Sequence, residues 1–325
     1  MKTTAIAPSN IAFIKYWGKK DEKLKLPLNG SISVNLSGLS TITTTEFSKK
    51  YEKDEVIING KQKKIMSEKV IKYLDLIRNK AKIKIKAKVV SQNNFPTASG
   101  LASSASGFAA LSLSATKAAG LDLSEKELTI IARQGSGSAC RSIPDGWVEW
   151  IEGDSNKNSY AYSIFPENHW NISIISAIIN YGEKKVKSTE GMRLVLENPF
   201  LKLRLKRIKQ KIEKLKKYIE LKKFTAFGEL IEKEALELHA MILTSSSPII
   251  YWEPMTIKLM KLIQQWRKEG LECYFTIDAG PHLKIIIEDK NKQKILNKLS
   301  TIQGLANLIV NKPCKGTQTS EEHLF

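Results

Sequence analysis

The chain has 325 residues, 42% of them hydrophobic, and its 52 basic and 33 acidic residues give a formal net charge of +19. This length allows one large core or two medium ones, and two domains are the expectation. No run reaches the ~18 uncharged apolar residues that a membrane span needs, and the start MKTTAIAPSN lacks the apolar middle of a secretion signal, so a soluble cytoplasmic protein with no membrane partner is expected.

The positive charge is carried mostly by lysine, since only seven of the 52 basic residues are arginines. Such a balance suits anionic partners, which include nucleic acid, a membrane surface and multiply phosphorylated small molecules. Lysine and isoleucine richness also fits an AT-rich genome or adaptation to heat. The three cysteines, Cys140, Cys273 and Cys314, show no CxxC spacing, so free thiols are expected, with a bond between subunits as the alternative.

The first third of the chain is expected to consist mainly of strands. β-Branched residues fill residues 41–48, Asn59-Gly60 is a hairpin signal, and residues 81–90 alternate apolar side chains with lysines. Between them, residues 67–80 place apolar side chains on one helical face, with Ser67 as the expected cap. The pattern predicts an antiparallel or mixed sheet that is covered on one side.

The middle of the chain begins with a helix at Ser124, where Ser124 and Glu127 form a capping box. Residues 146–153 and 171–181 are strand-like. Strands are then followed by helices and by strands again, without an internal repeat. This order predicts two α+β domains that meet near residues 165–185.

The second half is more helical. Residues 201–223 form a very basic segment with an apolar 3-4-3-4 stripe, and residues 225–243 continue the helical pattern. The basic segment could bind RNA or a membrane face, but the stripe requires only a packed inner face and a solvated outer face, which is the favoured interpretation. Residues 273–288 predict a hairpin of two buried strands around a DAGP turn, before a final helix and strand at 293–310.

The segment PTASGLASSASGFAALSLSA, residues 96–115, has the composition of a phosphate-binding helix start. Pro96 ends the preceding strand, Gly100 lets the backbone approach a ligand, and helix-forming residues follow. The N–H groups and dipole of that helix start would face a phosphate above Gly100, Ser103 and Ser104. No lysine follows the glycines, so this is not the GxxxxGK[ST] loop. A small-residue helix that packs closely against a sheet is the alternative.

Three further segments concentrate groups that do chemistry. Residues 7–37 bring lysines and aromatic residues beside turn residues. RQGSGSACRSIPDGW places Arg141 among small residues, where a guanidinium can hold a carboxylate or phosphate by two bonds. TIDAGP sets Asp278 at the end of an apolar strand, where desolvation would tune a carboxylate for proton transfer.

These motifs resemble the diphosphomevalonate decarboxylase family of the GHMP superfamily. NIAFIKYWGK, NNFPTASGLASSASGFAAL, GSGSACRS and DAGP occur in that family's order, and the resemblance covers nearly the whole chain. It implies a two-domain α+β GHMP kinase fold, in which residues 1–170 are like domain 2 of ribosomal protein S5 and residues 171–325 are ferredoxin-like. It also implies an active site between the domains, a homodimer, and ATP with Mg²⁺.

The resemblance further implies a role for individual residues. The implied catalytic residues are Asp278, Arg141 and Lys15. The implied substrate-binding residues are Tyr16, Trp17, Lys19, Ser136, Ser138, Arg141 and Ser188, with Lys184 or Lys185 as a basic neighbour of Ser188. The implied ATP-binding residues are Gly100, Leu101, Ala102, Ser103 and Ser104, with Mg²⁺ held through the ATP phosphates and Ser104.

Three positions depart from the family pattern. Gly30 stands where serine is usual, Ser99 replaces an alanine, and His282 follows DAGP where asparagine is common. The first two are mild changes. His282 lies four residues after Asp278, and an exposed or hydrogen-bonded histidine without effect on the site is expected there. His239 is expected to be a structural histidine.

The implied activity is ATP-dependent decarboxylation of mevalonate 5-diphosphate to isopentenyl diphosphate, through transient phosphorylation of the C3 hydroxyl. A phosphomevalonate decarboxylase or a mevalonate 3-kinase of the same fold is the close alternative. An RNA-binding protein is the alternative from a different class, suggested by the charge, but the chain lacks an RNA motif and no nucleic-acid partner is expected. No GxSxG elbow surrounds the serines, which argues against a hydrolase triad.

Overall fold

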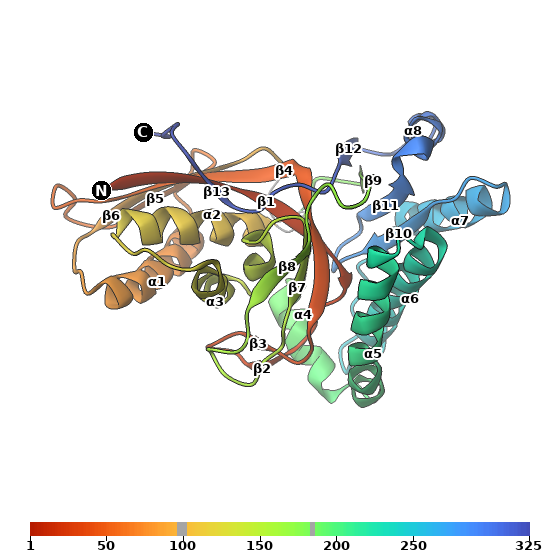
Figure 1. The fold of residues 1–325 in the computed structure, drawn as a ribbon, viewed down its shortest axis with the longest axis horizontal. Coiled ribbons are helices and arrows are strands. Elements are labelled where there is room, and N and C mark those ends of the chain that lie inside the picture. Colours follow the sequence, from red (N-terminus) through yellow and green to blue (C-terminus); the bar gives the residue numbers. More distant parts are fainter. Residues whose placement is uncertain (96–102, 183–185) are drawn as a thin grey trace.

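Two larger β-sheets with helices packed on them and one small two-stranded sheet make up the computed structural model, which describes residues 1–95, 103–182 and 186–325 (Figure 1). The strands are β1 (Lys2–Ile14), β2 (Lys19–Asp21), β3 (Leu26–Pro27), β4 (Ser31–Phe47), β5 (Glu55–Ile58), β6 (Ala87–Asn93), β7 (Trp147–Trp150), β8 (Ala161–Phe165), β9 (Ile172–Ile178), β10 (Tyr274–Ile277), β11 (Leu283–Glu288), β12 (Asn307–Asn311) and β13 (Gln318–Ser320).

The helices gather in two groups along the chain. The α-helices are α1 (Lys64–Ala81), α2 (Ser103–Ala118), α3 (Glu125–Gly135), α4 (Ser188–Leu194), α5 (Leu201–Glu220), α6 (Phe224–Leu243), α7 (Pro254–Lys268) and α8 (Lys292–Ser300), and the 3₁₀ turns are η1 (Gly137–Ser142), η2 (Val195–Glu197) and η3 (Asp289–Asn291).

The first sheet has the strand order β13-β1-β4-β6-β5, with β7 and β8 continuing from β4. Its pairs are antiparallel apart from β5 and β6, which are parallel, so the prediction of an antiparallel or mixed sheet is confirmed as mixed. Helices α1, α2 and α3 lie on one side of it (Figure 1). The second sheet has the order β10-β11-β9-β12 and is antiparallel.

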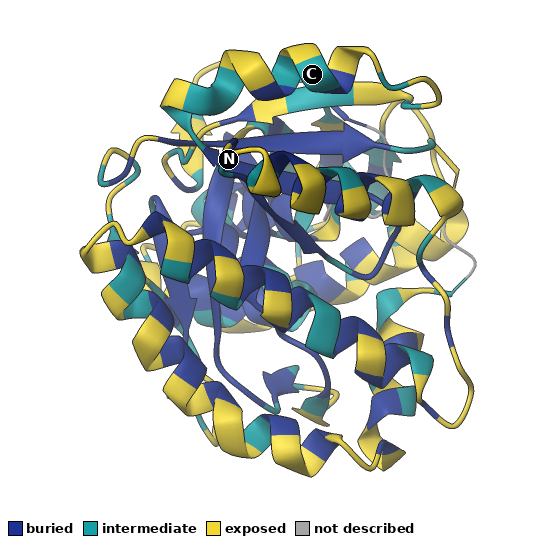
Figure 2. Ribbon diagram, turned by 90° about the vertical axis from the view of Figure 1, so that its right-hand side faces the viewer, coloured by how far each residue is buried: buried dark blue, intermediate teal, exposed yellow. Residues whose placement is uncertain are grey.

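The apolar core continues from the first sheet into the second. One buried cluster contains Phe13 of β1, Trp147 of β7, Ile174 of β9, Ile212 of α5 and Phe227 of α6. Figure 2 shows the buried strands inside and the exposed outer faces of the helices around them. Because these side chains come from both halves of the chain, the ends of β1 and β10, which carry Lys15 and Asp278, are held against one another by shared packing.

The position of the predicted domain boundary at residue 170 stays a prediction. Strand β8 ends at Phe165 and β9 begins at Ile172 in the other sheet. Residues 318–320, however, return as β13 to pair with β1, so the second part of the chain also completes the first sheet.

Several predicted elements agree with the structure. The Ser124–Glu127 capping box opens α3 with both of its reciprocal hydrogen bonds. Asn59 and Gly60 form a tight turn with φ of 50° and 72°, joined by a bridge between Ile58 and Lys61. The hairpin predicted at 273–288 is the β10–β11 pair.

The predicted inner face of the basic segment is confirmed in α5. Ile208, Ile212, Leu215 and Ile219 are buried, while lysines of the outer face are exposed. A packed helix with a solvated outer face explains the apolar stripe without a nucleic-acid or membrane partner.

Two local predictions are wrong. Ser67 does not cap its helix, because α1 begins one turn earlier at Lys64 and the Ser67 N–H already donates to the Lys63 carbonyl. Strand β6 begins at Ala87 and not at residue 81. The segment before it does not pair with a strand, and the carbonyl of Ile85 accepts a hydrogen bond from Arg78 Nε instead. Alternation of apolar residues does not report such a side-chain contact.

Candidate active site

The ends of two strands bring a buried ion pair together. Lys15 follows the last residue of β1, and Asp278 follows the last residue of β10. Lys15 Nζ lies 2.7 Å from Asp278 Oδ1, with side-chain exposures of 2% and 33%. Lys15 Nζ also donates to the Ala12 carbonyl at 2.7 Å. The lysine is therefore fixed beneath the carboxylate, which keeps one side open to a substrate.

The turn that carries Asp278 is anchored on three sides. His239 Nε2 of α6 lies 3.1 Å from the main-chain oxygen of Asp278. Thr256 Oγ1 of α7 donates to the Pro281 carbonyl at 2.8 Å. The Ile179 N–H donates to His282 Nδ1 at 3.2 Å. These contacts hold the tip of the hairpin. The hydrogen bond of His239 agrees with the structural role predicted for it, which stays a prediction.

Arg141 projects from the 3₁₀ turn η1 into a polar, buried setting. Its Nη1 donates to Ser31 Oγ at 2.9 Å and its Nη2 donates to Asn10 Oδ1 at 3.2 Å. The guanidinium also lies over the Trp150 ring, 5.7 Å from the ring centroid. Asn10 is itself fixed, since its Nδ2 donates to Ser142 Oγ at 2.8 Å. The planar fork is thus held in one orientation.

The charges of this site act on one another. Burial would raise the pKa of Asp278, but the ammonium of Lys15, the hydrogen bond from it and the charges of Lys284 and Arg141 hold that pKa below its ordinary value. Burial lowers the pKa of Lys15, and Asp278 opposes that effect. Burial also lowers the pKa of Lys284, to about 8. The charges of Lys15, Lys284 and Arg141 therefore all act on Asp278.

The aromatic residues after Lys15 are buried beside this centre. Tyr16 packs edge-on against Trp150 with centroids 4.6 Å apart, and a Cβ on Gly137 would lie 2.7 Å from the Tyr16 hydroxyl. Trp17 packs with Val195 and Leu201. The Tyr16 hydroxyl and the Trp17 indole N–H are buried and have no hydrogen-bond partner within the described residues. A polar ligand would satisfy such groups.

The remaining predicted substrate residues surround the same segment. Lys19 Nζ pairs with Glu22 Oε2 at 2.7 Å. Ser138 lies in η1, where its carbonyl accepts from Asn10 Nδ2 at 3.1 Å. Ser188 is the first residue of α4, the helix whose Gly191 lies against Trp17.

The predicted phosphate-binding helix start is only partly described. Ser103 and Ser104 are the first residues of α2, and Ser136 Oγ at the end of α3 donates to Ser104 Oγ at 3.3 Å. Two hydroxyl groups therefore meet at the N-terminus of a 16-residue helix, where an anion is favoured. The remaining predicted residues in this region, and the basic neighbours of Ser188, lie outside the described residues: Pro96, Ser99, Gly100, Leu101, Ala102, Lys184 and Lys185.

Two of the departures from the family pattern can be placed. A Cβ on Gly30 would lie 3.1 Å from both Ile212 Cδ1 and the Trp150 carbonyl, so a larger residue requires those neighbours to give way. His282 is buried and accepts the Ile179 N–H described above. His282 is therefore hydrogen-bonded and not exposed; because this bond anchors the turn that carries Asp278, the absence of an effect on the site stays a prediction.

Sequence reasoning missed the groups that hold the predicted ones. Asn10 and Ser31 orient Arg141, and Lys284 adds charge near Asp278. The available signal was a polar residue beside an apolar run: Asn10 directly precedes Ile11–Ile14 in β1, and Lys284 stands between Leu283 and Ile285 in β11. Such positions require a partner.

Other features of the described residues do not form a competing site. No group of three or more His, Cys, Asp or Glu residues in the described ranges could hold a metal ion. Within the same ranges no helix is both long and apolar enough to cross a bilayer. The three cysteines form no disulfide with one another.

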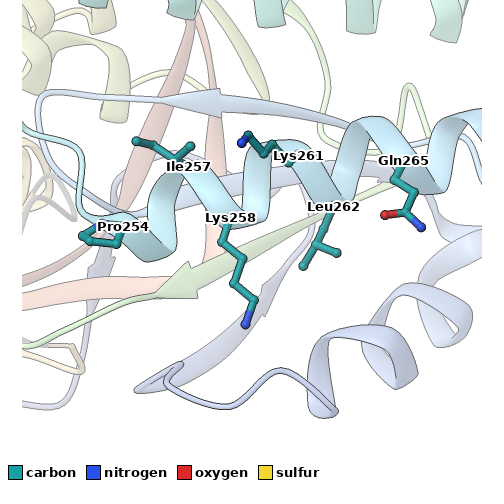
Figure 3. A pocket seen from close by; sticks show the side chains of 6 residues that line it. All are labelled: Pro254, Ile257, Lys258, Lys261, Leu262 and Gln265. Carbon is teal, nitrogen blue, oxygen red and sulfur yellow. The ribbon is translucent and has the colours of Figure 1, made fainter.

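A depression of about 370 Å³ lies on one face of α7 (Figure 3). It is lined by Pro254, Ile257, Lys258, Lys261, Leu262 and Gln265, none of which is a predicted site residue.

Comparison with known proteins gives a consistent result along the whole chain. Residues 7–161 match a family model described as the diphosphomevalonate decarboxylase-like N-terminal domain. Residues 174–323 match a model described as the mevalonate 5-diphosphate decarboxylase C-terminal domain.

Individual relatives agree with the family models. Diphosphomevalonate decarboxylase of Candida albicans is 38% identical over 311 residues, which cover 90% of this chain and 86% of that protein. A crystal structure of mevalonate diphosphate decarboxylase from Staphylococcus aureus is 40% identical, with a TM-score of 0.93 and 98% of each chain covered. A structure described as MDDEF in complex with MVAPP, AMPPCP and magnesium is 39% identical, with a TM-score of 0.93 and 99% of each chain covered. The predicted two-domain α+β fold class is confirmed by these structures.

Proposed function

The chain belongs to the diphosphomevalonate decarboxylase family, and on that premise we propose that Lys15, Arg141 and Asp278 form its catalytic centre. The chain is an ATP-dependent decarboxylase of the mevalonate pathway, and mevalonate 5-diphosphate is its substrate. The observation that supports the proposed centre is the Lys15–Asp278 ion pair beside the buried Arg141.

The reaction converts mevalonate 5-diphosphate and ATP to isopentenyl diphosphate, ADP, phosphate and carbon dioxide. ATP supplies the phosphoryl group that turns the tertiary C3 hydroxyl into a leaving group. The C–O bond then breaks with its electron pair leaving on phosphate, and the electrons of the carboxylate C–C bond form the new double bond as carbon dioxide departs. Positive charge grows at C3 during this step, so the protein must stabilise a cation beside a departing anion.

Asp278 is suited both to orienting the C3 hydroxyl and to stabilising the cation at C3. Its lowered pKa keeps the carboxyl ionised, so it can accept a hydrogen bond from the C3 hydroxyl and orient that oxygen for phosphorylation. The same negative charge stabilises the cation that develops at C3. Lys15, fixed by Asp278 and the Ala12 carbonyl, offsets negative charge on the transferred phosphate.

Arg141 suits the carboxylate end of the substrate. Ser31 and Asn10 hold its guanidinium on one side, so its orientation is set before substrate binds. A planar guanidinium binds a carboxylate by two parallel bonds. It must position that group without stabilising the ground state more than the transition state, because decarboxylation consumes the negative charge.

The start of α2 fits the phosphates of ATP. Ser136 Oγ meets Ser104 Oγ at this helix N-terminus, and Ser103 is the first residue of the helix. Gly100, Leu101 and Ala102 are included in the proposed ATP site on the family resemblance alone. Mg²⁺ would be held through ATP phosphates and Ser104, an arrangement that needs no protein cage of carboxylates. The relative bound to AMPPCP and magnesium supports this part of the proposal.

Tyr16, Trp17, Lys19, Ser136, Ser138 and Ser188 complete the proposed substrate site. The buried polar atoms of Tyr16 and Trp17 that lack partners within the described residues support it. Assembly as a homodimer and a location in the cytoplasm also belong to the proposal. Sedimentation of the purified protein would test the first of these.

A coupled ADP assay tests the function directly. Mevalonate, its 5-phosphate and its 5-diphosphate are compared as substrates, and released carbon dioxide is measured in the same samples. Equal amounts of ADP and carbon dioxide with the diphosphate alone are expected. Preference for the monophosphate, or ADP without carbon dioxide, would contradict the substrate or the decarboxylation step. Salt-sensitive RNA binding without ATPase activity would favour the RNA-binding alternative.

A further inference from the structure

Two charged residues occupy core-facing positions on the paired helices α5 and α6. Arg204 lies three residues after Leu201 and four before Ile208, and Glu234 lies three after Ile231 and four before Leu238. Both are on the buried face of their helix, with relative exposures of 4% for Arg204 and 0% for Glu234. A buried charge is destabilising unless a partner compensates it.

The two charges compensate one another. Arg204 Nη2 donates to Glu234 Oε1, and Lys211 Nζ lies 2.7 Å from Glu234 Oε2. Burial would raise the pKa of Glu234, but Arg204 and Lys211 hold that pKa below its ordinary value. The carboxylate is therefore ionised, and the pair is a fixed polar contact inside an apolar core.

The same two side chains bind the main chain of Lys15. Strand β1 ends at Ile14, so Lys15 has left the ladder of hydrogen bonds with β4. Its N–H donates to Glu234 Oε1 at 3.2 Å. Its carbonyl accepts from Arg204 Nη2 at 3.1 Å and from Asn29 Nδ2 at 3.0 Å. Buried backbone groups need partners, and here helices from the second half of the chain supply them.

We propose that the Arg204–Glu234 ion pair positions Lys15 for the reaction by holding both polar groups of its main chain. Arg204 and Glu234 are then positioning residues, which act through Lys15 and do not touch the substrate. The inference rests on the catalytic role proposed for Lys15. Its physical basis is that Lys15 Nζ contacts Asp278 at 2.7 Å, so a shift of the Lys15 backbone moves the ammonium relative to the reacting groups. A displacement of ~1 Å can lower a rate by about 10²-fold.

The first test replaces Arg204 by lysine, which preserves the charge opposite Glu234 and cannot make the bond to the Lys15 carbonyl with the same geometry. The matched control is Arg267→Lys. Arg267 forms a two-bond pair with Glu232 on the same helix α6, at 3.0 Å for each bond, outside the proposed site. We expect Arg204→Lys to lower kcat roughly 10-fold with KM for the diphosphate little changed, and Arg267→Lys to leave both near wild type.

The second test removes the negative charges instead. Glu234→Gln and Glu232→Gln each break a pair on α6, but only Glu234 contacts Lys15. Thermal unfolding is measured for every variant, and kcat is compared at a temperature where each is folded. If the Arg204–Glu234 pair is purely structural, kcat should fall in proportion to the loss of stability in the variants of this pair and of the Arg267–Glu232 pair alike. The positioning role predicts a kcat loss in the Arg204 and Glu234 variants that their melting temperatures do not account for.

The Lys15→Met variant separates this inference from the proposed function. Wild-type turnover in Lys15→Met overturns the catalytic role of Lys15, and with it the inference. An inactive Lys15→Met together with wild-type kcat in Arg204→Lys and Glu234→Gln overturns the positioning role alone. Equal kcat losses in the Arg204→Lys and Arg267→Lys variants also overturn it. Selective losses at Arg204 and Glu234 support it.

Discussion

Lys15 Nζ and Asp278 Oδ1 lie 2.7 Å apart although 263 residues separate them in the chain. The lysine ammonium is enclosed, whereas the aspartate keeps a third of its side-chain surface exposed. The contact is therefore one-sided: the lysine fixes the carboxylate from within the protein and leaves its outer side to a ligand. This arrangement links the chemistry of the site to the packing of the two sheets.

Replacement of Asp278 by alanine should lower kcat by roughly 10² to 10⁴-fold, the range for a positioned proton-transfer group. Substrate affinity should stay within a few fold of wild type, because the residues proposed to bind the substrate, Arg141 and those after Lys15, are unchanged. The coupled ADP assay gives kcat, and calorimetric titration gives the affinity. Asp122→Ala, which removes an exposed carboxylate paired with Lys117, is the control. A large loss of binding would contradict the role assigned to Asp278.

Replacement of Arg141 by lysine should lower kcat roughly 10- to 100-fold. A lysine ammonium cannot contact Ser31 and Asn10 and also present two parallel bonds to a carboxylate. Steady-state kinetics with the diphosphate measures the effect. The matched control is Arg207→Lys at an exposed position of α5. Wild-type kinetics in Arg141→Lys would show that the two-bond geometry is not used.

A methyl group at Gly137 should disturb the substrate site. Its Cβ would lie 2.7 Å from the Tyr16 hydroxyl and 2.9 Å from the ring, so Tyr16 must move. Gly137→Ala should destabilise the protein by roughly 1–3 kcal/mol and raise KM for the diphosphate. Gly107→Ala in α2 is the matched control, because its Cβ meets nothing within 4 Å. That variant should gain roughly 0.5–1 kcal/mol in unfolding free energy. Opposite signs in urea unfolding are the expected result.

The stability of the protein should depend on the charge state of Lys284. Burial lowers its pKa from 10.5 to about 8. Between those pH values the unfolded chain binds more protons than the folded one, so stability rises with pH. The cost of the buried charge is fully present below pH 8 and disappears toward pH 10.5.

The measurement compares wild type with Lys284→Met, which has nothing to titrate at this position. Between pH 8 and 10 the free energy of unfolding of the wild type should rise by roughly 2–3 kcal/mol relative to the variant. Urea unfolding at pH 7, 8, 9 and 10 gives this difference. Asp278 and Lys15 are the charged groups that act on Lys284, so the comparison is repeated in an Asp278→Asn background. A difference that stays flat would contradict the lowered pKa.

The sequence predicted the parts of the molecule that depend on local pattern. The capping box of α3, the Asn59-Gly60 turn, the hairpin of β10 and β11 and the inner face of α5 all follow from residues close together in the chain. Lys15, Arg141 and Asp278 are predicted as site residues because each stands in a distinctive short motif.

The missed features depend on contacts between distant segments. The parallel pairing of β5 with β6 is decided by neighbours in space. Arg204 and Glu234 lie in two predicted helices, but a charged residue on the buried face of a helix shows only that a partner exists and not which one. That the partner includes the backbone of Lys15 could not be predicted, because 189 residues separate Arg204 from it.

Strand β13 has a consequence for the order in which the molecule can be made. Thr4, Ala5 and Ile6 of β1 pair with residues 318–320, and the Leu324 N–H donates to Thr44 Oγ1 of β4. During synthesis the outer edge of β1 therefore stays uncovered until more than three hundred further residues have left the ribosome. An uncovered edge strand invites pairing with other chains. We expect the nascent polypeptide to depend on chaperone protection for most of its translation, and its vulnerability to aggregation to end with the last strand rather than with the first domain.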